Sequence, residues 1–315
     1  MIKVNFEQTW ITTSDGEELL LYKWYEKEQN PDAIIQIAHG MAEHMGRYDE
    51  FARFLVERKI FVFGNDHRGH GKTGKKKETL GFFANGNGFE RVTEDLNEVT
   101  HLIKKQYPAT PLFLLGHSMG SFLVRRYIQK YQEPLTGVIL SGTAGNPGIA
   151  GTIGIWLARK EKKKRGATAR SSFLNNLIFG NYNRKIKNPR TVFDWLSRDE
   201  NIVREYMADP FCGFICTTSF YEDLLNGLRC IHKQEELAKT PKDVPFFIFS
   251  GTDDPVGNYG KGVNEVINLY KQNGNPVTEK LYPGGRHEML NEINRHEVYS
   301  DIFEWITGIL QRKTM

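Results

Sequence analysis

The chain has 315 residues, of which 39% are hydrophobic and 25% are charged, and its formal net charge is +4. This composition is typical of a globular protein with room for one large domain and an insertion, and so small a net charge does not indicate a nucleic-acid partner. The first residues do not resemble a secretory signal, and no apolar run has the roughly 20 residues of a membrane-spanning helix. We therefore expect a cytoplasmic protein.

Predicted strands and helices alternate along most of the chain. Short apolar or β-branched runs favour strands, and apolar residues at helical spacing favour helices. The predicted strands cover residues 6–13, 18–25, 33–38, 60–63, 112–115, 138–140, 245–249 and 277–282. The predicted helices cover residues 48–58, 92–107, 119–131, 262–270 and 297–310. This alternation predicts an α/β fold with a mostly parallel sheet of eight strands and helices on both faces.

The alternation is interrupted between residues 143 and 230. This stretch contains 14 Lys and Arg against 8 Asp and Glu, whereas the rest of the chain is slightly acidic. Ligands bind at the carboxyl ends of the strands in open α/β sheets, so a basic insertion between two core strands is best explained as a cap over that edge. We expect a mainly helical cap at 143–230, inserted between the core parts 1–142 and 231–315.

Three cysteines are present, Cys212, Cys216 and Cys230. Their number is odd and their spacing is not that of a metal site, so a disulfide framework is not expected. We expect reduced thiols, in agreement with a cytoplasmic location.

The motif Gly-His-Ser-Met-Gly at residues 116–120 lies where a predicted strand meets a predicted helix. A tight turn in this position holds the serine in a strained conformation and points its hydroxyl out of the sheet. Side chains in place of Gly116 and Gly120 would collide with the neighbouring strand and helix. We therefore expect Ser118 to be a nucleophile, the alternative being a structural serine in a turn.

A nucleophilic serine needs a base, and the base needs an acid that orients it; in a sheet of this kind both follow the serine in chain order. Asp253 and Asp254 come directly after the predicted strand at 245–249, and His287 comes after the strand at 277–282. We assign His287 as the base and Asp254 as the acid. Asp253 is expected to shape the turn, since aspartate often bonds to nearby backbone.

Two other histidines are weaker candidates for the base. His117 is adjacent to Ser118, and adjacent side chains diverge on so sharp a turn, so we expect it to make a structural hydrogen bond. His296 lies at the start of the last predicted helix, where a solvated side chain is expected.

The tetrahedral intermediate of acyl transfer needs hydrogen-bond donors for its oxyanion. One expected donor is the N–H of Met119, directly after the serine. The other is the N–H of Met41 in the loop after the third strand, where a glycine lets the chain turn towards Ser118. His39 and His44 in this loop are residue types that bind metals, but the spacing supplies no further ligands, and no metal site is expected.

Five separated blocks resemble the monoacylglycerol lipase and lysophospholipase family of α/β-hydrolases in order and approximate spacing. They are HGMAEHMGRY at 39–48, DHRGHG at 66–71, GHSMG at 116–120, GTDDPV at 251–256 and GRHE at 285–288. The resemblance implies the α/β-hydrolase fold and a serine hydrolase, with Ser118, Asp254 and His287 as the catalytic triad and Met41 and Met119 at the oxyanion hole. It also implies hydrolysis of carboxylic esters of lipids, with no cofactor or metal.

The insertion has two informative stretches. A helix is predicted after Asn146, which can cap it with Pro147 at its first position. Four apolar residues then share one face, next to a basic run at 159–165: Ile149, Ile153, Trp156 and Leu157. We expect this stripe to pack on the core beneath a solvated basic tip, the alternative being transient contact with an anionic membrane or a lipid headgroup. The aromatic stretch at 211–225 either lines an acyl pocket or forms the core of the cap.

Other functions on the same fold stay open at this point. A thioesterase or acyltransferase would use the same groups, and an aminopeptidase of the proline-iminopeptidase kind would need an acidic cluster in the cap to hold the substrate amine. A non-catalytic ligand-binding module is the alternative from a different class. The sequence defines neither the oligomeric state nor the acyl chain and headgroup of the substrate.

Overall fold

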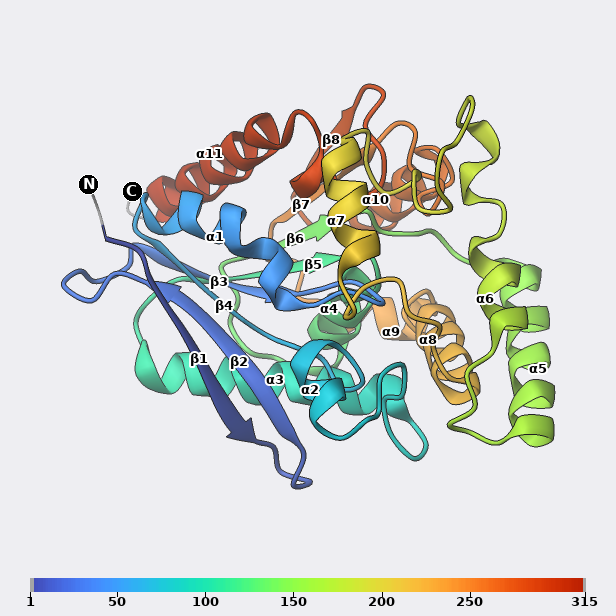
Figure 1. Ribbon diagram of the computed structural model, residues 1–315. Helices are drawn as coiled ribbons and strands as arrows, with labels where there is room; N and C mark the ends of the chain where they lie inside the picture. The colour runs from blue at the N-terminus through green and yellow to red at the C-terminus, as the bar shows by residue number, and fades with distance from the viewer. Residues whose placement is uncertain (1–2, 314–315) are drawn as a thin grey trace.

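The computed structural model describes residues 3–313. Its strands are β1 (Asn5–Thr12), β2 (Glu18–Tyr25), β3 (Ala33–Ala38), β4 (Ile60–Asn65), β5 (Leu112–His117), β6 (Gly137–Ser141), β7 (Phe246–Gly251) and β8 (Val277–Tyr282). They form an eight-stranded sheet in the order β1-β2-β4-β3-β5-β6-β7-β8 (Figure 1). β2 pairs antiparallel with β1 and with β4, and the other neighbouring strands are parallel. The predicted mostly parallel sheet of eight strands is therefore confirmed.

The central strands are mostly apolar because both faces of the sheet are covered. Every residue of β3, β4, β5 and β7 is buried. The helices outside the interruption are α1 (Asp49–Val56), α2 (Gly71–Lys76), α3 (Gly88–Gln106), α4 (Met119–Lys130), α9 (Gln234–Leu237), α10 (Lys261–Asn273) and α11 (Arg295–Lys313). α1 and α11 pack together on one face of the sheet, and α3 and α4 pack together on the other (Figure 1).

The segment between β6 and β7 is mainly helical, as expected. It contains α5 (Gly148–Arg165), α6 (Ser172–Phe179), α7 (Glu200–Ala208) and α8 (Thr218–Cys230). α5, α6 and α8 share one apolar cluster with residues of α4. This contact with α4, which begins directly after β5, seats the segment over the carboxyl ends of the central strands.

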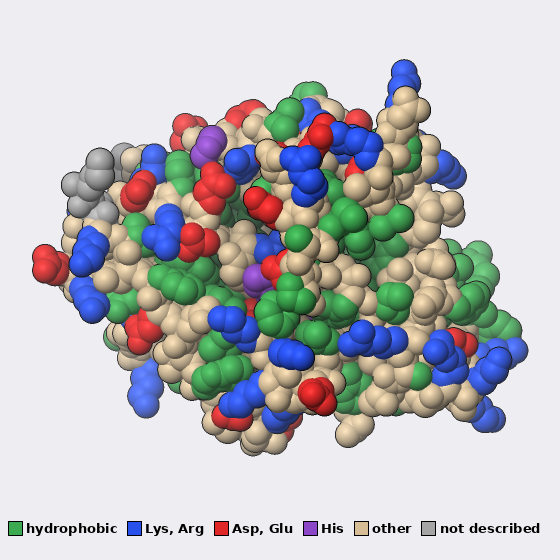
Figure 2. All heavy atoms as spheres, in the orientation of Figure 1, with side chains coloured by type: hydrophobic (Ala, Val, Ile, Leu, Met, Phe, Trp, Pro, Cys, Tyr) green, Lys and Arg blue, Asp and Glu red, His purple; other side chains and the backbone are tan. Residues whose placement is uncertain are grey.

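The apolar stripe predicted on α5 faces solvent. Ile149, Ile153 and Trp156 are 81%, 52% and 53% exposed, whereas Leu157 packs into the apolar cluster below. Figure 2 shows hydrophobic side chains beside Lys and Arg at this edge of the molecule. Packing of the whole stripe on the core is therefore wrong. The buried side of α5 instead has small residues, and at Gly154 an added Cβ would stand only 3.0 Å from a side chain of α8.

Two local features differ from the sequence-based expectation. α5 begins at Gly148, after Pro147, although Asn146 Oδ1 still accepts the N–H of Gly148 at 2.9 Å. The sequence pattern also does not predict α2, because residues 71–76, GKTGKK, have no apolar period.

Candidate active site

Ser118 occupies a strained turn between β5 and α4. Its φ is +52° and its ψ is −119°, a conformation that residues other than glycine rarely adopt. A Cβ at Gly116 would lie 2.4 Å from Gly120 O, and one at Gly120 would lie 1.9 Å from Ala38 O, so only glycine fits at either position. The N–H of Ser118 donates to Ser141 O at 2.9 Å. The turn therefore presents the serine at the carboxyl edge of the sheet, as the motif predicts.

Asp254 and His287 lie on the loops after β7 and β8, and their side chains meet. Asp254 Oδ1 and His287 Nδ1 are 3.0 Å apart, and both side chains are buried. Ser250 Oγ donates to Asp254 Oδ2 at 2.7 Å, and the N–H of Val256 donates to Oδ1 at 2.8 Å. The carboxylate thus assigns the ring hydrogen of His287 to Nδ1 and leaves Nε2 as an acceptor.

The electrostatics of this pair suit proton transfer. Burial raises the pKa of the Asp254 carboxyl, but the contacts with His287, Ser250 and Val256 outweigh burial and hold the pKa below its usual value. Burial lowers the pKa of His287, but the Asp254 carboxylate, together with the charges of Glu288 and Glu43, more than offsets this, so the pKa of His287 stands above its usual value. An aspartate that stays ionised in this position stabilises the imidazolium that forms when the histidine takes a proton.

A cavity of about 560 Å³ joins the predicted site residues. Ser118, His287, Met41 and Met119 all line it, while Asp254 is buried beside His287. The structure brings the candidate acid and base into contact. Ser118 lies on the same cavity wall as His287, but among the described residues its Oγ makes no hydrogen bond to His287. Catalytic hydrogen bonds are often long in a free enzyme and tighten when substrate binds.

The loop after β3 lies against the serine turn. A Cβ at Gly40 would stand 3.4 Å from Ser118 Cβ and 2.7 Å from Glu43 Oε1, so the close approach needs glycine. The N–H of Met41 donates to no protein group within residues 3–313. Met119 is the first residue of α4, where an N–H has no partner within the helix. Both N–H groups are therefore available to a ligand in the cavity.

A buried ion-pair network joins this loop to the loop of His287. Arg47 Nη1 contacts Glu43 Oε2 at 2.7 Å, and Arg47 also binds both carboxylate oxygens of Glu288 at 2.6 Å. Glu43 in turn accepts the N–H of Gly40. All three charged residues lie in or beside the sequence blocks, but their spacing alone does not reveal that they meet. The network fixes the two loops relative to each other.

The segment between β6 and β7 contributes contacts to the same loops. Tyr206 Oη and the N–H of Gly213 both donate to Ala42 O, at 2.9 and 3.0 Å. Ala42 has a φ of +51°, so these bonds hold a strained residue next to the expected oxyanion donor. The rings of Trp195 and His287 lie 5.2 Å apart. No sequence pattern identifies these residues, because their role depends on contacts between distant parts of the chain.

The weaker candidates for the triad lie elsewhere. Asp253 is exposed, and within the described chain its carboxylate does not contact His287. His117 is buried, and its Nδ1 lies 3.2 Å from Ser141 Oγ, which is the structural hydrogen bond expected for it. The side chain of His296 is 73% exposed, in agreement with the expected solvated position.

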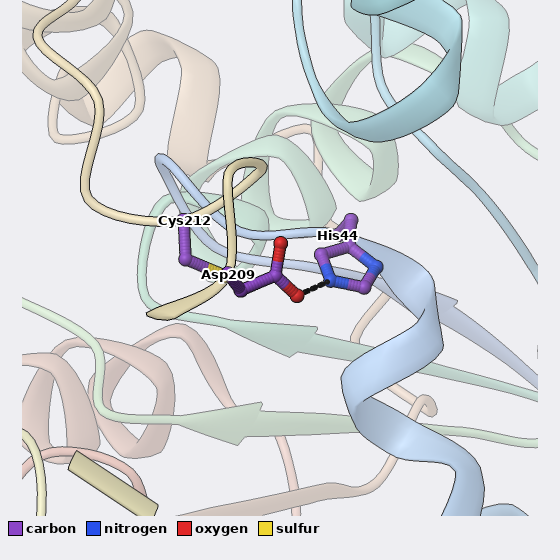
Figure 3. A group of neighbouring side chains, drawn as sticks. All are labelled: His44, Asp209 and Cys212. Atoms are coloured by element: carbon purple, nitrogen blue, oxygen red, sulfur yellow. Dashed lines mark hydrogen bonds and ion pairs between the residues drawn. The ribbon is translucent and has the colours of Figure 1, made fainter. Parts of the chain in front are cut away.

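One group of side chains has the composition of a metal site. His44, Asp209 and Cys212 have potential ligand atoms within 4.8 Å of one another (Figure 3), so the fold supplies neighbours that the spacing of His44 does not. His44 Nδ1 accepts the N–H of Gly46, and Nε2 lies 2.9 Å from Asp209 Oδ2. Burial raises the pKa of the Cys212 thiol, which disfavours the thiolate that a metal would need. The group therefore links the loop after β3 to the α7 region and does not form a convincing metal centre.

Comparisons with known proteins agree with this geometry. The family model described as serine aminopeptidase, S33 (Hydrolase_4) matches residues 29–294. A monoacylglycerol lipase of Mycolicibacterium smegmatis is 28% identical over 300 residues, covering 94% of this chain and 95% of that protein. The human monoglyceride lipase is 28% identical over 302 residues, covering 94% of this chain and 89% of that protein. Among solved structures, a thermostable carboxyl esterase of Bacillus coagulans in complex with glycerol has a TM-score of 0.90 and 29% identity, covering 97% of this chain and 99% of that one. This chain thus belongs to the Hydrolase_4 family of serine hydrolases, which has the α/β-hydrolase fold.

Proposed function

We propose that this protein hydrolyses carboxylic esters of lipids, monoacylglycerols or lysophospholipids, through an acyl-enzyme on Ser118. The observation that carries the proposal is one cavity wall on which a serine in a strained turn lies with a buried histidine held by an ionised aspartate. The similarity to proteins named as lipases of monoacylglycerols supports the same substrate class here.

In the proposed mechanism, His287 takes the proton of Ser118 while Oγ attacks the ester carbonyl. The N–H groups of Met41 and Met119 donate to the oxyanion, and each such donor is worth about 10² to 10³ in rate. Asp254 keeps the ring in the required tautomer and stabilises its charged form. The leaving alcohol then takes the proton from His287, and a water molecule hydrolyses the acyl-enzyme by the same route.

The cavity suits a substrate with one long apolar chain. Its volume of about 560 Å³ falls in the usual range for a small-molecule site, and most of its lining is apolar. The stretch at 211–225 fulfils both roles considered for it. Phe214, Leu224 and Leu225 line the cavity, whereas Phe220 is fully buried in the apolar cluster beneath.

We also propose that residues 143–230 are a cap domain inserted between the core parts 1–142 and 231–315, and that its outer face makes transient contact with lipid surfaces. Phe173 and Leu177 on α6 are each 51% exposed and add to the exposed stripe on α5. The last turn of α5 is basic, which favours an anionic surface. None of the helices in the described chain has the length and apolar character needed to cross a bilayer.

Aminopeptidase activity, which the description of the family model names, has less support. An aminopeptidase needs an unoccupied carboxylate for the substrate amine. Glu43 and Glu288 line the cavity, but both are paired with Arg47 at 2.7 and 2.6 Å. A thioesterase or acyltransferase would use the same catalytic groups as an esterase, so a comparison of substrates has to separate them.

The test is a panel of substrates given to the purified protein: a monoacylglycerol, a lysophosphatidylcholine and an acyl-CoA of the same chain length, and an amino-acid p-nitroanilide. We expect the highest kcat/KM for the two lipid esters, and a fluorophosphonate adduct on Ser118 by mass spectrometry. Faster turnover of the acyl-CoA or the p-nitroanilide would replace the proposed substrate class. Absence of both turnover and labelling would indicate a non-catalytic binding protein.

A further inference from the structure

Arg125 on α4 is a buried cation that forms no direct ion pair within the described chain. Its side chain is completely buried, and no carboxylate of the described residues lies within 4.0 Å of its guanidinium. Burying a charge is unfavourable, and burial lowers the pKa of Arg125 although the side chain of Tyr270 and the charge of Glu265 act in the opposite direction. The hydrogen bonds of the guanidinium go to neutral groups.

The guanidinium contacts both connectors of the cap domain. The entry connector, residues 142–147, leads from β6 to α5, and the exit connector, residues 231–233, leads from α8 to α9. Arg125 Nη1 donates to Ala144 O at 3.0 Å, and Nη2 donates to His232 Nε2 at 3.0 Å. One side chain of the core thus bridges the two places where the chain enters and leaves the cap domain.

His232 is held in the form that this bridge requires. Its Nδ1 lies 2.8 Å from Leu228 O and therefore carries the hydrogen, which leaves Nε2 as the acceptor for Arg125. Burial, together with the charge of Arg125, lowers the pKa of His232 to about 3, so the ring is neutral near pH 7. A guanidinium suits two separated acceptors because its N–H donors diverge in a rigid plane, whereas the ammonium of lysine is a compact point charge.

The entry connector lines the cavity of Ser118, and the exit connector is bonded to a residue of α8 that lines it. Ala144, whose carbonyl oxygen accepts from Arg125, lines the cavity. Leu228, whose carbonyl oxygen accepts from His232, lines it as well. Gly142 lies against the candidate base, since a Cβ there would stand 2.9 Å from an atom of the His287 ring. A shift of either connector would therefore move part of the wall that meets the acyl chain of the substrate.

We infer that Arg125 is a positioning residue that holds both ends of the cap domain against α4 and thereby sets the shape of the acyl-binding wall. The expected change in KM rests on the proposed ester hydrolysis, whereas the expected change in hydrogen–deuterium exchange of the connectors does not depend on it. Gln129, one turn further along α4, provides a matched control. Its buried Nε2 donates to Ile231 O at 2.9 Å and so contacts the exit connector alone.

The test compares Arg125→Met with Gln129→Met in the full chain. It measures kcat and KM for p-nitrophenyl butyrate and laurate, and hydrogen–deuterium exchange of both connectors. For Arg125→Met we expect an about tenfold higher KM for the laurate ester, with kcat within about threefold of the wild type. Exchange in both connectors should be at least about tenfold faster. For Gln129→Met we expect faster exchange in the exit connector only.

KM and exchange rates of Arg125→Met within about twofold of the wild-type values would overturn the inference. Should the wild type hydrolyse no ester, the proposed function fails, and the exchange rates still decide the role of Arg125. Should Arg125→Met not fold, Arg125→Lys decides, because lysine keeps the charge but cannot span two diverging acceptors. We then expect faster exchange in at least one connector, and wild-type exchange in both would contradict the inference.

Discussion

The proposed cap domain has an outer face and an inner segment whose contacts differ. The outer face, on α5 and α6, presents five apolar side chains that are each at least 51% exposed: Ile149, Ile153, Trp156, Phe173 and Leu177. The inner segment, residues 193–214, instead binds the loops that carry the candidate catalytic groups. One region of the insertion is thus an exposed apolar surface, and the other contacts the loops of the candidate site.

The contacts of the inner segment are directed hydrogen bonds. The N–H of Glu288 donates to Leu196 O at 2.8 Å, next to the candidate base. Arg286 Nη1 donates to Asp194 O at 2.6 Å and to Ser197 O at 2.8 Å. These bonds attach the inner segment to the loop after β8. Any movement that admits a lipid is therefore expected in α5 and α6, with the inner segment left in place.

Among the variants that probe this comparison, the largest effect is expected beneath the inner segment, at the candidate acid. Asp254→Asn should lower kcat by about 10³ to 10⁴, because the base loses both its tautomer and the stabilisation of its charge. Asp253→Asn, at the exposed neighbour, should stay within about twofold of the wild type. Steady-state hydrolysis of a water-soluble ester measures both variants, and the reverse ranking would transfer the role of acid to Asp253.

The same buried pair predicts the pH dependence. Burial lowers the pKa of His287, but Asp254, with smaller contributions from Glu288 and Glu43, more than offsets burial, so the pKa is raised. Because the reaction needs the neutral ring, kcat/KM should rise with pH through a midpoint above about 6.5, and Asp254→Asn should move that midpoint down. The free energy of unfolding should change in the opposite direction with pH. Protonated His287 stabilises the folded protein, fully so below about pH 6.5, and this contribution is lost as the pH rises through the pKa of His287 in the folded protein. A wild-type midpoint below about 6 would contradict the predicted shift.

A smaller effect is expected at the inner segment itself. Tyr206→Phe removes the hydrogen bond to Ala42 O and should loosen the loop of Met41, the proposed oxyanion donor. We expect an about tenfold lower kcat with KM changed less than about twofold, the size of one buried hydrogen bond that acts on the transition state. Tyr221→Phe is the control, because it removes a hydrogen bond to Asn175 within the proposed cap domain and should leave kcat close to that of the wild type. A wild-type kcat in Tyr206→Phe would show that this hydrogen bond of the inner segment does not contribute to catalysis.

The smallest effect on catalysis is expected at the outer face. Ile153→Ser and Trp156→Ser should leave kcat/KM for a water-soluble ester within about twofold and the free energy of unfolding within about 0.5 kcal/mol, because both side chains are exposed. Binding to anionic vesicles should weaken about tenfold for each, since apolar area that a bilayer would bury is lost. Co-sedimentation measures this, with Leu102→Ser on α3 as an exposed apolar control. Unchanged vesicle binding of both variants would contradict the proposal that the outer face contacts lipid surfaces.

The parts of this molecule that sequence predicts are those encoded locally. Apolar runs mark the buried strands, and the glycines around Ser118 mark a turn whose geometry tolerates no side chain. Asp254 and His287 follow from their places after successive strands. Contacts such as Tyr206 with Ala42 join positions 164 residues apart, and no local pattern of charge or apolarity encodes them.

The orientation of α5 shows a second limit. Its large apolar residues have the right spacing for a buried face, yet glycine and alanine on the other side allow a closer approach to α8. Helix packing is decided by how near two backbones can come, which depends on the partner helix as much as on the helix itself. A hydrophobic stripe alone therefore does not identify the buried side.

The most direct test of the central claim is kcat/KM of Ser118→Ala for a monoacylglycerol, measured together with fluorophosphonate labelling and thermal unfolding. We predict a loss of about 10⁴-fold or more, no label, and a melting temperature close to that of the wild type. Turnover within about tenfold of the wild type in a folded Ser118→Ala protein would contradict the assignment of Ser118 as the nucleophile.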